Sequence, residues 1–267
     1  MIKDLTEQIL STPVPNLDVA RSLRTAGYAN VPLELDHPLR NDPLVLLSDY
    51  GIASQSYYSR KNSTGDPVPG VKPEVFLRKD VAERLAQANE FLQAAEFITR
   101  QCGGIVELFV DDGLRSIELQ RLVHDEIYPN YLRLSNPNWS EAEILEKRDK
   151  AAAVPSQASP HASGGVADIK LRLIEGGHVG YGRDKAIRET MQTDYYEYNE
   201  GSDIFRVNRR IIFHTLTAAG LVNNPEEVWH YGRGDRLSHV VSPAIMPGSL
   251  IVPAYYAAVE GAPELDR

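Results

Sequence analysis

The chain has 267 residues, of which 42% are hydrophobic and 24% are charged, and its formal net charge is −9. This composition is that of a globular protein, with enough length for one large hydrophobic core or two modest ones. The negative charge disfavours binding of nucleic acid or of an anionic membrane through the whole surface, although it leaves room for a local basic patch.

Cysteine content and hydrophobic runs exclude further classes of protein. The single cysteine, Cys102, cannot form an intramolecular disulfide or a cysteine-rich metal site. The first 18 residues lack the apolar core of a signal peptide, and no run approaches the ~20 apolar residues of a membrane span. We therefore expect a soluble, cytoplasmic protein that does not enter a membrane.

The N-terminal region, residues 1–78, is hard to assign because prolines interrupt it. Residues 43–48 can form a short buried strand. Residues 54–70 are rich in Ser, Tyr, Gly and Pro, which indicates a loop. That loop either lies over a site or is a plain surface excursion.

The next region predicts a helix followed by a strand. Apolar residues at helical spacing run from Asp80 to the Gly103-Gly104 pair, and Asp80 and Glu83 have the spacing of a capping box. Residues 105–110 then predict a buried strand. Arg115 lies in the turn just past that strand, where functional groups are often presented, but its position alone favours a surface salt bridge.

Three more helices are expected. They cover residues 116–131, residues 140–150, where Ser140 and Glu143 form a second capping box, and residues 203–219. The apolar stripe of the last helix leaves His214 outside it, which predicts an exposed imidazole. The final stretch, from Ser238 onward, reads as short strands and proline turns.

Between these helices, one stretch places an imidazole and a carboxylate on either side of a glycine pair. It reads Ser159-Pro-His-Ala-Ser-Gly-Gly-Val-Ala-Asp168, and it continues as an alternating strand over residues 166–174. The glycines allow a tight turn that carries His161 back over the start of the strand, beside Asp168. His and Asp suit Zn²⁺, but two ligands do not make a metal site, so the stretch alone favours a capped turn with an exposed His161.

A second pair of a carboxylate and an imidazole lies further along the chain, in Glu227-Val-Trp-His230. Residues three apart are neighbours on a helix, whereas on a regular strand they point to opposite faces. The segment is too short to decide between the two, and a β-bulge would bring both side chains to one site. A buried strand edge with a salt-bridged glutamate is the alternative.

Together the pairs supply the parts of a zinc hydrolase site. His161, Asp168 and His230 are three protein ligands, and catalytic zinc sites keep three such ligands and one open position. Glu227 is near the third ligand and can act as a general base. Arg115 can stabilise a developing oxyanion.

With these residues the sequence resembles the zinc D-alanyl-D-alanine dipeptidases, including those of vancomycin resistance, and the wider group of zinc D,D-carboxypeptidases. The similarity covers roughly residues 70–240 and includes Leu77-Arg-Lys-Asp80 and Asn223-Asn-Pro-Glu226. It implies a single-domain α+β fold with a central, mainly antiparallel sheet flanked by helices. Residues 71–245 would form the catalytic domain, with an N-terminal extension over 1–70 packed on this core and a C-terminal extension over 246–267.

The resemblance also implies roles for single residues. His161, Asp168 and His230 would bind one Zn²⁺ per chain, Glu227 would be the general base, and Arg115 would stabilise the tetrahedral intermediate. Ser159 would help to bind a dipeptide substrate.

The sequence departs from the family pattern in two places. Ser116 follows the arginine where the family usually has proline. In the loop after the second ligand, Met191-Gln-Thr-Asp-Tyr-Tyr196 places a tyrosine where the family has an ammonium-binding aspartate. Asp194 or Glu197 is a candidate to replace it, and the sequence does not choose between them.

Three functions therefore compete. The chain is a dipeptidase acting on D-Ala-D-Ala or a related short peptide, a zinc amidase or carboxypeptidase acting on another small amide, or a non-catalytic binding module of the same fold. Retention of Glu227 disfavours the binding module, because a binder needs no base beside the metal. A dipeptidase would act in the recycling of cell-wall precursors or in glycopeptide resistance.

Overall fold

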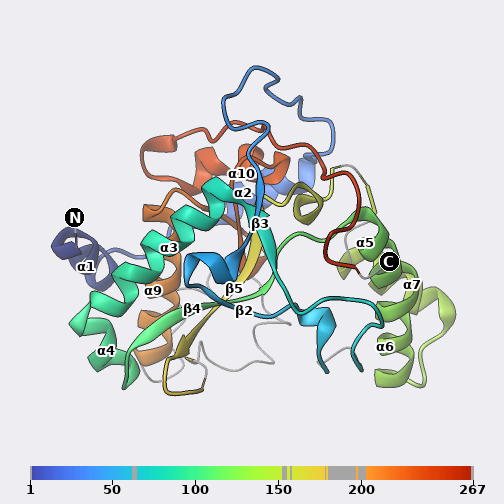
Figure 1. Cartoon of the computed structure of the whole chain (residues 1–267), viewed down its shortest axis with the longest axis horizontal. Coiled ribbons are helices and arrows are strands. Elements are labelled where there is room, and N and C mark those ends of the chain that lie inside the picture. Colours follow the sequence, from blue (N-terminus) through green and yellow to red (C-terminus); the bar gives the residue numbers. More distant parts are fainter. Residues whose placement is uncertain are drawn as a thin grey trace.

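The structure is a computed structural model of the whole chain, and it describes residues 2–61, 65–151, 155–156, 158–177, 179, 197 and 203–265. Within these residues the fold is α+β, with a five-stranded sheet flanked by helices (Figure 1). The strand order is β2 (Ala53–Ser54), β4 (Val106–Asp112), β5 (Val166–Leu173), β7 (Glu227–Gly232) and β6 (Val222–Asn224). Only the β2–β4 pair among them is parallel, so the expected mainly antiparallel sheet is present.

The strands β4 and β5 have one apolar face and one mainly polar face. Val106, Leu108 and Val110 of β4 and Ile169 and Leu171 of β5 are fully buried in the main hydrophobic core. The alternate residues form the other face, where Glu107 lies opposite Arg172 and Phe109 opposite Lys170. An irregularity between Val110 and Asp112 places Asp112 opposite Asp168, so both carboxylates lie on this polar face.

The apolar face is covered by four helices, and Figure 1 shows α1, α3, α4 and α9 together on that side. They are α1 (Ile2–Ser11), α3 (Lys79–Ala94), α4 (Glu96–Cys102) and α9 (Asp203–Ala218). On the other side lie α5 (Ile117–Leu122), α6 (Tyr128–Ser135) and α7 (Glu141–Ala151), and a π-helical turn, η3 (Val123–Ile127), joins α5 to α6. Separately, β1 (Leu44–Leu46) pairs antiparallel with β3 (Phe76–Arg78).

The helix expected from Asp80 to Cys102 is two helices, because Ala95 adopts an extended conformation between α3 and α4. The first helix begins at Lys79, and no side chain caps it. Asp80 instead accepts a hydrogen bond from Arg84 and lies 3.3 Å from Arg233. The capping box of Ser140 and Glu143 is confirmed, since each residue accepts a hydrogen bond from the other's backbone N–H.

The first part of the stretch after Ser238 is helical, contrary to the expected strands and turns. α10 (Arg236–Ile245) begins after Asp235, whose side chain caps it by accepting from the N–H of Ser238. The proline that suggested a turn, Pro243, lies inside this helix. Its missing N–H leaves the carbonyl of His239 without an intrahelical donor, and the hydroxyl of Ser242 donates to that carbonyl instead.

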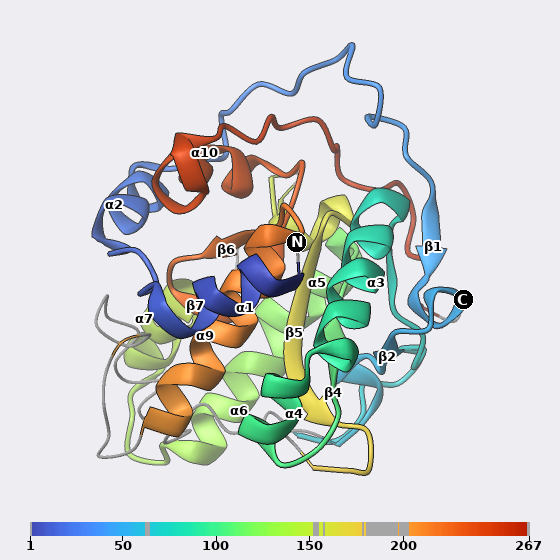
Figure 2. The ribbon, with the colours of Figure 1, turned by 90° about the vertical axis from the view of Figure 1, so that its left-hand side faces the viewer.

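The N-terminal region contains two helices that its sequence did not predict, α1 and α2 (Asp18–Ala26). α1 packs on α9 and α2 packs on α10, as Figure 2 shows. His214 of α9 is consequently buried, with its Nε2 2.8 Å from the carbonyl of Thr12, so the expectation that it is exposed was wrong. In the part of the chain that the structure describes, we find no helix with the length and hydrophobicity needed to cross a membrane.

Candidate metal centre

The structure brings His161, Asp168 and His230 together, with one ligand atom of each within 4.8 Å of the others. His161 lies in the 3₁₀ turn η4 (Pro160–Ser163), Asp168 on β5 and His230 on β7. Asp168 and His230 are direct partners in the β5–β7 ladder. Both imidazoles are buried, and these three side chains could hold a metal ion.

The glycine pair after η4 folds the loop as the sequence predicted. Gly164 adopts a left-handed conformation, with φ 71°, and its N–H closes the turn onto the carbonyl of His161. Gly165 has no room for a side chain, because a Cβ there would lie 2.6 Å from the carbonyl oxygen of Arg233. The backbone therefore reverses closely enough for His161 to reach the start of β5.

Hydrogen bonding fixes the orientation of the first imidazole. Nδ1 of His161 donates to the carbonyl of Gly113 at 2.8 Å, which directs Nε2 toward Asp168 Oδ1 at 3.5 Å. Nδ1 of His230 lies 3.3 Å from the same carboxylate oxygen. A backbone carbonyl that holds the outer nitrogen of an imidazole is the usual support of a histidine ligand.

A distortion of β7 brings Glu227 to the same place. In the β6–β7 ladder Asn223 pairs with Tyr231, but the next residue, Asn224, pairs with Glu227, so three residues of β7 have no partner on β6. As a result Glu227 Oε2 lies 3.1 Å from His230 Nδ1. The segment is therefore a bulged strand, which resolves the alternatives that the sequence left open.

The charges in this cluster are strongly coupled. Burial alone would raise the pKa of Asp168, but the two imidazoles outweigh it and hold that pKa far below its usual value. Burial would lower the pKa of His230, yet its close contacts with the carboxylates of Asp168 and Glu227 raise the pKa to about 10. The pKa of Glu227 is lowered, because contact with His230 outweighs burial. The carboxylates of Asp168 and Glu227 therefore stabilise positive charge between them, and either protons on the imidazoles or a metal ion can supply that charge.

Two buried atoms test whether a metal fits. Oδ1 of Asp168 and Nε2 of His230 have no hydrogen-bond partner among the described residues. Buried polar atoms are normally satisfied, so a buried carboxylate oxygen that lies between two imidazoles and accepts no hydrogen bond from a described residue suits a metal ligand. The donor set of two imidazoles and one carboxylate is one that zinc accepts.

Arg115 lies beside this cluster, held by residues that the sequence did not single out. Its Nε donates to Asp112 Oδ2 at 3.0 Å and its Nη1 to Gln120 at 2.8 Å, while the ring of Tyr58 covers its guanidinium. Asp112 Oδ2 is also 3.9 Å from His161 Nδ1. Burial would lower the pKa of Arg115, but Asp112 and other neighbours outweigh it and raise the pKa, so Arg115 stays charged.

Two further sequence expectations concern a serine and a loop. Ser159 is buried, and its hydroxyl has no hydrogen-bond partner in the described ranges. Tyr58, which belongs to residues 54–70, packs on the guanidinium of Arg115. The only sequence feature that pointed to Tyr58 was the polar, tyrosine-rich composition of residues 54–70. Asp112 was noticed in the sequence only as part of the turn before Arg115.

The loop that the family resemblance assigns to substrate binding is only partly described. Met191 to Tyr196, with the candidate Asp194, lie outside the described residues. The other candidate, Glu197, forms an ion pair with Arg210 and accepts a hydrogen bond from the N–H of Val14 at 2.8 Å. Its carboxylate is therefore already engaged by a cation of this chain.

Comparison with models of known protein families and with curated proteins finds no match to this chain.

Proposed function

We propose that this protein is a zinc-dependent peptidase that hydrolyses D-Ala-D-Ala or a related short peptide. The observation that carries the proposal is the contact between Glu227 and His230, 3.1 Å apart, at the edge of a three-ligand cluster. A base placed beside such a cluster has a use in hydrolysis and none in a purely structural metal site.

In this proposal Glu227 moves the proton. Its side chain is 32% exposed, so water can reach it, and Asn224 Nδ2 holds its Oε2 at 2.8 Å. Glu227 accepts a proton from the attacking water and later delivers it to the leaving amine. A Zn²⁺ bound by His161, Asp168 and His230 would supply Lewis acidity, which polarises the scissile carbonyl and lowers the pKa of water toward ~7.

Arg115 and Ser159 would act on the substrate. A guanidinium has five N–H groups, and Asp112 and Gln120 engage three of those of Arg115. The remaining two can donate to the oxyanion that develops on the carbonyl. The unsatisfied hydroxyl of Ser159, two residues before His161, is available to hydrogen-bond a bound peptide.

A panel of substrates tests the proposal. The purified protein is incubated with D-Ala-D-Ala and with other D- and L-dipeptides, with and without a chelator, and amine release is followed. We expect hydrolysis of at least one short peptide that the chelator abolishes and added zinc restores. Hydrolysis that survives complete removal of the metal would overturn the zinc mechanism, and no hydrolysis of any dipeptide would overturn the dipeptidase assignment.

A second candidate is a zinc amidase or carboxypeptidase whose substrate has no free ammonium at this position. The engagement of Glu197 by Arg210 favours it, because this removes one of the two carboxylates proposed to bind that ammonium. N-acetylated dipeptides in the same panel distinguish the two. Faster hydrolysis of the acetylated series would identify the amidase or carboxypeptidase, and faster hydrolysis of the free dipeptides would identify the dipeptidase.

A further inference from the structure

The C-terminal segment runs past both of the turns that build the candidate site. The N–H of Val259 donates to the carbonyl of Ala162, the residue after His161, at 2.7 Å. Five residues later, Glu264 Oε1 accepts a hydrogen bond from the N–H of Ser116, the residue after Arg115, at 2.9 Å. The segment thus connects the turn that carries the first ligand with the turn that carries the arginine.

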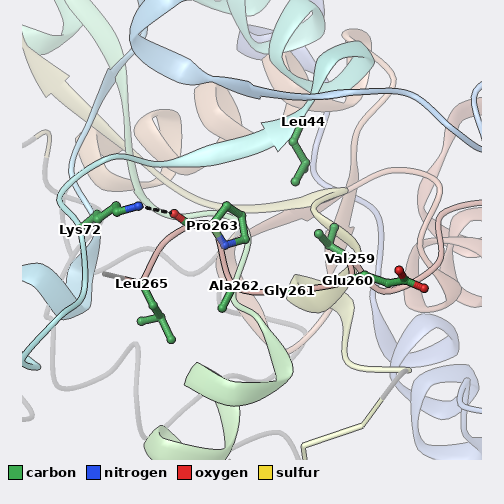
Figure 3. Close-up of a pocket in the computed structure, with 8 residues that line it drawn as sticks. All are labelled: Leu44, Lys72, Val259, Glu260, Gly261, Ala262, Pro263 and Leu265. Atoms are coloured by element: carbon green, nitrogen blue, oxygen red, sulfur yellow. Dashed lines mark hydrogen bonds between the residues drawn. The ribbon is translucent and has the colours of Figure 1, made fainter. Parts of the chain in front are cut away.

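Between these two contacts the segment lines an open pocket of about 570 Å³. Figure 3 shows that the segment lines this pocket together with Leu44 and Lys72, and that Lys72 Nζ donates to the carbonyl of Pro263. Beyond it, the segment is fixed by the N–H of Lys72, which donates to the carbonyl of Glu264, and by a bridge between Val71 and Leu265. The placement of Glu264 is therefore well defined by its own backbone.

The side chain of Glu264 is buried, with 3% of its surface exposed. Its second oxygen, Oε2, is buried without a hydrogen-bond partner in the described part of the chain. A buried carboxylate with an unsatisfied oxygen costs stability. Packing alone therefore does not explain why residue 264 is a glutamate. The hydrogen bond that its Oε1 accepts from the N–H of Ser116 offers a structural reason.

Ser116, which donates this hydrogen bond in the turn beside Arg115, also contacts the start of α5. The hydroxyl of Ser116 caps α5 by accepting from the N–H of Leu119, and its carbonyl accepts from the N–H of Gln120. Gln120 in turn accepts from Arg115 Nη1. Ser116 thus connects the backbone next to Arg115 with the side chain that holds its guanidinium.

We propose that Glu264 is a positioning residue for Arg115, holding the Ser116 N–H and so fixing the turn that presents the guanidinium to the candidate metal centre. The inference rests on the proposed function, in which Arg115 acts on the oxyanion. It also gives Ser116 a reason to differ from proline, because proline has no N–H to donate to Glu264.

Variants at Glu264 separate positioning from general stability. Glu264→Ala removes the acceptor, whereas Glu264→Gln keeps an oxygen that can accept from Ser116. We expect Glu264→Ala to lower kcat roughly 10- to 100-fold, with zinc content and KM near those of the wild type, since small displacements of a catalytic group cost this much. Glu264→Gln should restore most of kcat. Glu260→Ala, on the exposed part of the same segment, is the matched control and should leave kcat unchanged.

A double variant tests the route through Ser116. The φ of Ser116 is −54°, which suits proline, so Ser116→Pro removes the N–H, together with the hydroxyl that caps α5, and requires no different φ. In that background Glu264→Ala should lower kcat no further. An additional loss equal to that in the wild type would show that Glu264 does not act through Ser116, and unchanged kcat in Glu264→Ala would overturn the proposal outright.

Hydrogen exchange provides a readout that does not depend on turnover. We expect the Ser116 amide to lose protection in Glu264→Ala and to keep it in Glu260→Ala. If the wild type hydrolyses no substrate, the hydrolase assignment fails, and this exchange experiment still decides whether Glu264 holds the turn. Unchanged protection of Ser116 in Glu264→Ala would overturn the positioning role in either case.

Discussion

Glu227 Oε2 lies 3.1 Å from Nδ1 of His230, although the two residues are three apart on one strand. A regular strand would place them on opposite faces. The bulge in β7 removes that separation, because three residues of β7 lie between ladder pairs that are consecutive on β6. The proposed base and the proposed third ligand therefore share one face of the sheet.

The first prediction concerns Glu227. Glu227→Gln removes the proton acceptor and leaves the three ligands in place, so kcat should fall by ~10² to 10⁴-fold while zinc stays bound. Steady-state kinetics and elemental analysis of the same sample measure both. Glu226→Gln is the matched control, because Glu226 lies in the adjacent hairpin turn and pairs with Arg24. Equal activity of the two variants would refute the assignment of Glu227.

The second prediction concerns the metal. His230→Ala removes one of three ligands, and zinc content after dialysis should fall well below one per chain. His239→Ala should retain full zinc, because the imidazole of His239 contacts the carbonyl of Val252 and is not part of the cluster. Full zinc in His230→Ala would exclude His230 as a ligand.

The third prediction concerns Asp112. It accepts two hydrogen bonds from Arg115 and lies 3.9 Å from His161. Asp112→Asn removes the charge that orients the arginine, so we expect kcat to fall about 10- to 100-fold. Asp111→Asn provides the comparison, because Asp111 pairs with Arg60 and Lys170. The expectation is contradicted if both variants lose the same activity at equal folded fraction.

The fourth prediction concerns pH and the ion pair of Glu197 with Arg210. Burial would raise the pKa of Glu197, but Arg210 and the N–H of Val14 outweigh it and lower that pKa. The pair therefore stabilises the fold above the unfolded-state pKa of about 4.3, and this stability is lost as the pH falls through the lower folded-state value.

Thermal melting measures this effect. Glu197→Gln should lower Tm at pH 7 by a few degrees, corresponding to about 1 kcal/mol, and should differ less from the wild type at low pH. Glu90→Gln, exposed on α3, should change Tm at neither pH. A Tm difference for Glu197→Gln that grows on acidification would have the wrong sign.

The sequence predicted the parts of this structure that depend on local signals. The glycine pair after His161 and the alternation after Asp168 define a turn and a strand within a few residues. The same alternation predicted which face of β5 is apolar. The α+β class was expected from the family resemblance, and the fold of the described residues agrees with it.

The remaining features depend on contacts between distant residues. His214 is buried because α1, some two hundred residues earlier, covers it, and no property of α9 alone contains this information. α10 was missed because Pro243 suggested a turn, whereas the hydroxyl of Ser242 compensates for the missing donor. The contact of Glu264 with Ser116 joins residues 148 apart, and neither residue carries a motif.

A zinc titration tests the central claim most directly. Protein stripped of metal is titrated with Zn²⁺, and the rate of D-Ala-D-Ala hydrolysis is measured at each addition. If the cluster of His161, Asp168 and His230 is the catalytic metal site, the rate rises linearly and stops rising at one zinc per chain. A rate that does not respond to zinc, or no hydrolysis at full zinc occupancy, would contradict the account.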